Sequence, residues 1–347
     1  MGGVRAKFVA PGGNFQLFLW TQETQHVIVS HCGEERRIRL PSSLRTSAST
    51  SDEPPISSPR AAAPELRVEK NLARLGYFAP LTKRSRAAVT RRVAPAGGSG
   101  EVRICADTAI GLPTTADLDR YLVFLQIVNG FIRTSTSERS VLSPVTFTSY
   151  EMIRYLGNLI RSGKNYASVA AWLHRMAGTT IEARGGGFFL ARTQSYAEGS
   201  FRVFERIVAA GDPRADGRPA DRNYVWLPEW YLDNMEAGYF VTLPVAAYRR
   251  LKRGISKALA LALPAHGGPD PRRAEMGYEE LCRLMNLAPY RFPSKVEEKL
   301  APALEELRKA GFVEKWRLRW KNGSATLDVT LPAKAPRGAP APAAAGA

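Results

Sequence analysis

Apolar and polar residues follow one another along residues 65–215 in a pattern that predicts a complete domain. Alternation in EVRICA (101–106) predicts a strand. The apolar spacing then takes the helical period and predicts three successive helices, over residues 117–130, 146–157 and 163–178. Thr114 or Thr115 is the predicted N-cap of the first helix, and a glycine ends each of the other two. TTIEAR and FFLART follow as two strands around a flexible turn at Gly185–Gly187.

A similar order of elements returns over residues 221–332. A strand and a connecting turn over 221–240 precede three predicted helices, over residues 243–263, 277–287 and 294–311. A hairpin from Arg317 to Val329 ends this second pattern. Helices followed by a hairpin in this order are typical of a winged-helix domain, and helix-turn-helix readers place the last helix in the major groove. The sequence therefore predicts an α+β protein with tandem winged-helix domains, 65–215 and 221–332.

Two low-complexity ends flank the predicted domains. Residues 1–64 include SSLRTSASTSDEPPISSPRAAAPE, which is rich in Ser, Pro and Ala and has no periodicity. We expect this N-terminal extension to be disordered, with FQLFLW (Phe15–Trp20) as its candidate strand. Residues 333–347 form a Pro/Ala tail that has no means of building a core.

The C-terminal hairpin carries cations on one face. Asn322-Gly323 is a strong signal for a two-residue turn. The register then pairs the residues of the apolar face, Trp316 with Val329, Leu318 with Leu327 and Trp320 with Ala325. The opposite face of the first strand holds Lys315, Arg317, Arg319 and Lys321. We expect Arg319 and Lys321 to bind phosphates and both tryptophans to lie in the core, while Arg317 has a cross-strand ion pair with Asp328 as its alternative.

The third helix of the first domain has one apolar face. Its predicted core stripe is Tyr166, Val169, Ala170, Leu173 and Met176. That stripe leaves Asn165, Ser168 and Arg175 facing outward, with Trp172 at the boundary.

The corresponding helix of the second domain carries mixed charges. Its predicted core stripe is Val296, Leu300, Ala303, Leu304 and Leu307. Lys295 and Lys299 share the outer face with four carboxylates, Glu297, Glu298, Glu305 and Glu306. Pro302 is expected to kink the helix or open its second half. Because acidic side chains are repelled by phosphates, we expect DNA contact from the N-terminal turn, through Arg291, Ser294, Lys295 and Lys299; a solvated charged face is the alternative.

The chain is strongly basic. Its 347 residues carry 49 Lys plus Arg against 32 Asp plus Glu, a formal net charge of +17. Such an excess favours a polyanionic partner, most often nucleic acid. Arginine predominates, which suits phosphate and base-edge contacts, although a GC-rich genome gives the same bias. No run of 18 apolar residues predicts a membrane helix, and three distant cysteines (Cys32, Cys105 and Cys282) are typical of a reduced, cytoplasmic protein.

Catalytic chemistry finds little support in the sequence. The four histidines are His26, His31, His174 and His266, and their spacing does not give the His-apolar-His metal pair of strand-nicking initiators. HExxH, GxSxG, GxxxxGK and paired-carboxylate patterns are missing from the sequence. We therefore expect no enzyme activity, no metal and no cofactor.

Three stretches resemble a known family. VRICADTAIGLPTTADLDRYLVFLQI, FTSYEMIRYLG and SGKNYASVAAWLHRMAGTTI, in this order, are similar to the plasmid replication initiator protein A family. EKNLARLGYF upstream and LAPALEELRKAGFVEKW downstream extend the resemblance to residues 65–331, more loosely in the second half. The resemblance implies tandem winged helices that bind repeated sites of double-stranded DNA at a plasmid origin. It also implies opening of an adjacent AT-rich stretch, recruitment of the host helicase machinery, and a switch between an active monomer and a self-repressing homodimer.

Position within the predicted domains then assigns contacts to DNA. We expect base reading from Asn165, Ser168 and Arg175, and phosphate anchoring from Lys164, Arg184, Lys295, Lys299, Arg319 and Lys321. Two other functions remain open. A winged-helix transcription regulator would bind one palindrome at a promoter, and a nicking enzyme would need a metal-dependent tyrosine nucleophile.

Overall fold

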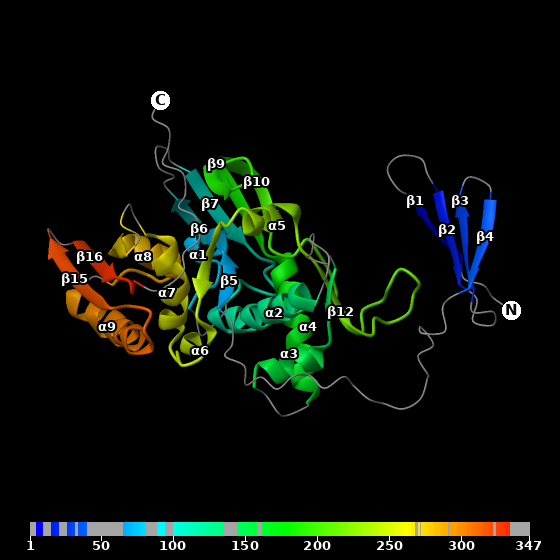
Figure 1. The fold of residues 1–347 in the computed structure, drawn as a ribbon. Coiled ribbons are helices and arrows are strands. Elements are labelled where there is room, and N and C mark those ends of the chain that lie inside the picture. The colour runs from blue at the N-terminus through cyan, green and yellow to red at the C-terminus, as the bar shows by residue number, and fades with distance from the viewer. Residues whose placement is uncertain are drawn as a thin grey trace. The chain divides into compact units, whose positions relative to one another are not determined.

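The structure is a computed structural model, and it describes residues 5–9, 15–20, 26–31, 34–39, 65–80, 89–93, 100–134, 144–157, 162–267, 270, 272–290, 292–321 and 324–333. The chain divides into two compact units, residues 1–58 and residues 59–347 (Figure 1). Helices and strands both build the second unit, in agreement with the predicted α+β class. The predicted tail beyond residue 333 and the linker 40–64 lie outside the described residues.

The N-terminal unit contains an antiparallel sheet whose strands follow their order in the chain. The strands are β1 (Arg5–Val9), β2 (Phe15–Trp20), β3 (His26–His31) and β4 (Glu34–Arg39). Phe18 of β2 lies opposite Ala6 of β1 and Val29 of β3. The sequence predicted β2 alone within this extension. Its neighbours were missed because a segment such as EERRIR in β4 has too few apolar residues to show alternation.

The first half of the second unit contains the predicted helices. Its elements are β5 (Leu66–Glu69), α1 (Lys70–Arg74), β6 (Val89–Val93), β7 (Gly100–Cys105), α2 (Thr115–Thr134), β8 (Val145–Phe147), α3 (Ser149–Tyr155), α4 (Gly163–Gly178), β9 (Thr180–Leu190) and β10 (Ser195–Arg202). At the start of α2, the Asp117 carboxylate accepts hydrogen bonds from the backbone N and hydroxyl of Thr114, at 2.9 and 3.2 Å. Thr148 and Glu151 form a capping box on α3.

The strand β9 runs through Gly185–Gly187, so the predicted turn at these glycines is wrong. β9 pairs with β10 from Leu190↔Ser195 to Thr180↔Arg202, and residues 191–194 make the connecting turn. A Cβ on Gly187 would lie 2.4 Å from Val102 Cγ2 in the neighbouring strand β7. The glycines therefore allow close approach between strands, in the four-stranded order β10-β9-β7-β6.

A connecting region joins the two halves. It contains β11 (Arg206–Val208), β12 (Asn223–Trp226), α5 (Glu229–Glu236) and β13 (Phe240–Leu243). β12 pairs with β11 on one side and with β8 on the other, and β13 pairs with β5. Residues 221–243, which the sequence assigned to the second domain, therefore extend two sheets of the first half.

The second half contains two helices where the sequence predicted a single helix over 243–263. Its elements are α6 (Val245–Tyr248), α7 (Gly254–Ala265), β14 (Arg273–Gly277), α8 (Tyr278–Met285), α9 (Pro293–Ala310), β15 (Lys315–Lys321) and β16 (Ser324–Thr330). The helix breaks between α6 and α7 because the Glu306 carboxylate accepts hydrogen bonds from the backbone N of Lys252 and Arg253, at 2.8 and 3.3 Å. β16 lies centrally in the order β14-β16-β15. The predicted hairpin register is confirmed, with Trp320↔Ala325 and Lys321↔Ser324.

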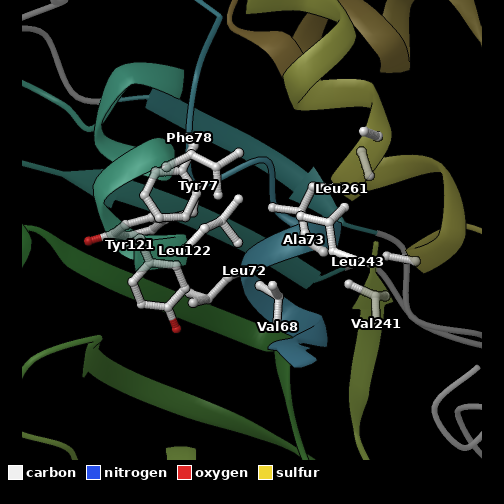
Figure 2. Close-up of a cluster of buried hydrophobic side chains, with 14 of the residues drawn as sticks. Val68, Leu72, Ala73, Tyr77, Phe78, Tyr121, Leu122, Val241, Leu243 and Leu261 are labelled. Carbon is white, nitrogen blue, oxygen red and sulfur yellow. The ribbon is translucent and has the colours of Figure 1, made fainter. Parts of the chain in front are cut away.

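One hydrophobic core extends through both halves of the second unit. Figure 2 shows Val68 and Leu72 near Tyr121 and Leu122 of α2, with Leu243 and Leu261 on the other side. Close backbone contact also joins the halves, since a Cβ on Gly76 would lie 2.2 Å from the carbonyl oxygen of Leu284. These contacts fix the position of α7 and α8 relative to α1 and α2.

Candidate nucleic-acid interface

Helix α4 begins and ends where the sequence predicted. The Ser162 side chain accepts a hydrogen bond from the backbone N of Asn165, at 3.4 Å, and so caps the first turn. Val169, Leu173 and Met176 of the predicted stripe are buried, which confirms its centre. Two placements at its edges are wrong, because Tyr166 is 39% exposed and Trp172 is fully buried. The apolar face is therefore rotated away from Tyr166 and toward Trp172.

The rotation takes Arg175 into the interior, so the prediction that it faces outward is wrong. Its guanidinium Nη1 lies 2.7 Å from Oδ1 of Asp117, and the Asp117 side chain has no exposed surface. Arg175 Nε also donates to the carbonyl oxygen of Ile110, at 3.5 Å. A buried arginine that is engaged in this way has no free edge for a base. It instead ties α4 to the N-terminus of α2.

The other predicted base-reading residues lie near the start of α4. Asn165 and Ser168 are half-buried, whereas Lys164, a predicted phosphate contact, is exposed. The Ser168 hydroxyl accepts a hydrogen bond of 2.6 Å from Nη2 of Arg120 in α2. Arg120, which the sequence did not single out, therefore holds its guanidinium beside α4, and Ser168 positions it.

The residues that form the exposed face of α4 are mostly uncharged, and none of them is a carboxylate. Its exposed residues are Gly163, Lys164, Tyr166, Ala167, Ala171, His174 and Gly178. The helix contains no Asp or Glu. Small side chains at Ala167 and Ala171 let the helix backbone approach a partner surface closely. Lys164 adds positive charge at one end of this face.

Helix α9 presents a different surface. The predicted core stripe from Val296 to Leu307 is buried and thereby confirmed. The helix is continuous through Pro302 from Pro293 to Ala310, so of the two effects predicted for Pro302, a kink or an opened second half, the opening is wrong.

The exposed cations of α9 have carboxylate partners. Lys295 Nζ lies 2.6 Å from Oε2 of Glu298, whose hydrogen bond raises the pKa of Lys295. Lys299 Nζ lies 3.9 Å from Oε1 of the same Glu298. Ser294 is exposed, and Arg291 lies outside the described residues. The charge on this face is therefore largely compensated within the helix.

One of the four α9 carboxylates, that of Glu306, is half-buried and hydrogen-bonded within the protein. Glu306 accepts hydrogen bonds from the Ser256 hydroxyl, at 2.5 Å, and from two backbone N–H groups at the start of α7. Burial by itself raises the pKa of Glu306, but these hydrogen bonds lower it overall. Glu306 thus caps the start of α7.

The β15–β16 hairpin keeps only part of its predicted basic face. Arg319 forms ion pairs with Asp328 across the hairpin and with Glu275 of β14, the second at 3.2 Å. Lys315 and Arg317 are exposed, and Arg317 lies opposite Asp328 as predicted, although Asp328 binds Arg319 instead. The Lys321 side chain lies outside the described residues. Trp316 is partly buried against the core, but Trp320 is 40% exposed, which corrects its predicted core position.

Arg184 lies within the β9 sheet and not at a hairpin tip. Its Cα partner in β7 is Glu101, and the neighbouring pair is Glu182 with Arg103. Opposite charges therefore face each other across the two strands, which reduces the cationic character of Arg184. The structure does not bring Arg184 together with α9 or with the β15–β16 hairpin as a single patch.

Two further properties bear on function. Among the described residues, no helix is long and apolar enough to cross a membrane. Within the same residues, no three His, Cys, Asp or Glu side chains lie together as a metal site would require.

Comparison with known proteins identifies a family whose matched residues include α4. The family described as "RPA: Replication initiator protein A" matches residues 67–291. No curated protein matches the chain. Among solved structures, the chain is similar to a crystal structure of SeMet derivatives of domain 2 and domain 3 of RctB, with 13% sequence identity and a TM-score of 0.49. That similarity covers 76% of this chain and 98% of the RctB chain.

Proposed function

The chain belongs to the replication initiator protein A family, and on this basis we propose that it binds double-stranded DNA at repeated sites in a replication origin. The observation that carries the proposal is the family match over residues 67–291, which contains all of α4 and its supporting elements. The net charge of +17 supports a polyanionic partner.

Helix α4 is the element that enters the major groove in this proposal. The order α2–β8–α3–α4–β9–β10 supports the predicted winged-helix assignment, in which the last helix reads DNA, although β8 pairs with β12 and not with β9 or β10. The exposed face of α4 supports this role, because Ala167 and Ala171 permit close approach and no carboxylate on the helix repels phosphates. Lys164 and Arg120 contribute positive charge at its N-terminal half. Base reading falls to the exposed residues and to Asn165 and Ser168.

The second half acts as a weaker reading head. The order α7–β14–α8–α9–β15–β16 and the sheet order β14-β16-β15 support the predicted winged-helix assignment here as well. Its cations at Lys295, Lys299 and Arg319 already have carboxylate partners, so each phosphate contact would first have to displace a carboxylate. Lys315 and Arg317 on the edge strand β15 provide contacts without that cost. Two linked heads on one chain bind adjacent sites more tightly than either alone, through effective concentration.

The consequences for replication require no active site. Binding to several repeats bends or strains the DNA between them, and favourable contacts offset the cost of unstacking an adjacent AT-rich stretch. The opened origin then receives the host helicase and its loading proteins. A homodimer that covers one reading head would repress this activity. We place the protein in the cytoplasm, without catalytic chemistry of its own.

Footprinting of the purified chain on DNA that flanks its gene, at two salt concentrations, tests the proposal. Protection of several evenly spaced repeats, weakening at higher salt as counterion release requires, would support an initiator. Protection of one isolated palindrome would favour a transcription regulator. A covalent protein–DNA adduct would favour a nicking enzyme and would contradict the proposal.

A further inference from the structure

A long hairpin projects from the sheet that contains β8. Its strands are β11 and β12, and pairing continues beyond them to the bridge Pro213↔Pro219 and the 2.8 Å hydrogen bond from Arg214 N to Arg218 O. Figure 1 shows the chain before β12 extending away from the helices. Gly217 closes the tip with a φ of +76°, a conformation that favours glycine. Residues 206–226 therefore form an ordered arm, and we refer to them as the arm.

The arm lies beside the exposed face of α4. Nε2 of His174, on that face, is 3.7 Å from Oδ2 of Asp212 in the arm. The same Asp212 oxygen accepts a 3.0 Å hydrogen bond from the backbone N of Ala209, which fixes the carboxylate at the base of the arm. A duplex that contacts the α4 face would therefore pass next to the arm.

Aromatic rings hold two arginines of the arm in place. The Arg206 guanidinium carbon lies 3.7 Å from the centre of the Trp226 ring, and that of Arg214 lies 5.2 Å from the centre of the Tyr224 ring. The two rings are themselves stacked, with centroids 6.4 Å apart and an interplanar angle of 26°. Arg214 also donates to the Tyr224 hydroxyl, at 3.1 Å, whereas Arg206 keeps its N–H edge free and can bind a phosphate without a further loss of side-chain entropy.

The carboxylates of the arm accept hydrogen bonds, whereas the side chains of Arg206 and Arg218 are free to bind a ligand. Asp216 accepts the backbone N–H of Arg218, and Asp221 accepts the Tyr224 hydroxyl, at 3.1 and 3.0 Å. In the part of the chain that the structure describes, the side chains of Arg206 and Arg218 have no hydrogen bond or ion pair, and both are exposed. Residues 206–226 carry four arginines against three aspartates, so the arm has a net charge of +1.

We propose that the arm binds the phosphate backbone of duplex DNA beside the groove that α4 enters, through Arg206 and Arg218. This inference rests on the proposed function, because it takes α4 as the helix that contacts DNA. The ligand is the sugar-phosphate backbone of a duplex, so the contact adds affinity and orientation without sequence preference.

The salt dependence of binding tests the arm. Each phosphate contact contributes about −0.9 to the slope of log K against log salt. We compare the full chain with Arg206→Gln/Arg218→Gln on the flanking DNA and on a random duplex, by fluorescence anisotropy between 50 and 200 mM salt. The double variant should have a slope shallower by about 1.8 on both DNAs. Arg272→Gln/Arg308→Gln is the control, because it removes two exposed arginines that are paired with Glu314 and Glu305.

The outcomes separate the arm from the proposed function. An Arg206→Gln/Arg218→Gln variant with an unchanged slope, or with the same change as the control, would overturn the inference while wild-type footprints on repeats still support the initiator. If the wild-type chain protects no repeats but the two chains still differ in slope on random duplex, the initiator proposal is rejected and the phosphate contact of the arm is supported. Arg206→Lys, which keeps the charge without the planar fork, should bind more weakly than wild type with an unchanged slope. Arg206→Lys therefore controls for a loss of the arm's structure, and circular dichroism shows whether each variant is folded.

Discussion

The Arg175–Asp117 pair provides the sharpest test of how α4 is held. Arg175→Met keeps most of the side-chain volume but leaves the Asp117 carboxylate buried without its cation. Removing one partner of a buried ion pair costs about 3–5 kcal/mol. Asp117 still accepts two hydrogen bonds from Thr114 in the variant. We therefore expect a loss near the lower end, about 3 kcal/mol of unfolding free energy.

Urea unfolding, followed by circular dichroism at pH 7, measures this loss by linear extrapolation. The matched control is the double variant Arg175→Met/Asp117→Asn, which removes both charges and keeps an acceptor for Thr114. It should recover at least half of the lost stability, because no unpaired charge is left buried. The ratio of specific to non-specific DNA affinity should stay the same in Arg175→Met at temperatures where it is folded. An Arg175→Met chain of wild-type stability that loses only specific binding would refute this reasoning and restore Arg175 as a base-reading residue.

Two further predictions concern the core. Burial raises the pKa of Glu69 to about 7 and lowers that of His266 to about 4. Glu69 therefore contributes stability that is lost as pH rises from about 4.5 to 7, whereas His266 contributes stability that is lost as pH falls from about 6.5 to 4. The two contributions to the free energy of unfolding, each about 2 kcal/mol between pH 5 and 7.5, offset each other in the wild-type chain. In His266→Leu only the Glu69 contribution is left, so the free energy of unfolding should fall by about 2 kcal/mol as pH rises from about 5 to 7.5. A pH profile parallel to that of wild type would contradict this prediction. Gly76→Ala should cost more than about 2 kcal/mol in urea unfolding, because it adds a clash with Leu284 to the cost of positive φ. Gly157→Ala, with positive φ and open space around it, should lose only about 1–2 kcal/mol, and equal losses would show that the Leu284 contact does not matter.

The sequence predicted those features that depend on local pattern. The bounds of α4 followed from a helical apolar period and a final glycine, and the structure adds the Ser162 N-cap. The register of β15 and β16 followed from the Asn322-Gly323 turn, and the α9 stripe followed from five apolar residues at helical spacing. Each of these signals lies within about twenty residues, so no distant partner was needed to interpret it.

The errors arose where a distant partner decides the outcome. Arg175 follows Trp172 by three positions, so it lies on the same face once Trp172 is buried. Its partner Asp117 is 58 residues earlier in the chain. Glu306 was taken as an outward acid because nothing near it in sequence shows that it caps α7. The arm beside α4 was missed for the same reason, since β12 is placed by pairing with β8.

The contact of the α4 face with duplex DNA is the central claim, and one pair of matched variants tests it most directly. Ala171→Glu places a carboxylate on the exposed face of α4, whereas Ala246→Glu makes the same change at an exposed position of α6. Like charges brought together at an interface cost several kcal/mol. The affinity of Ala171→Glu for the footprinted DNA should therefore fall by about 100-fold or more, with Ala246→Glu close to wild type and both variants folded. Equal affinity of the two variants would contradict the account, because DNA could not then contact the exposed face of α4.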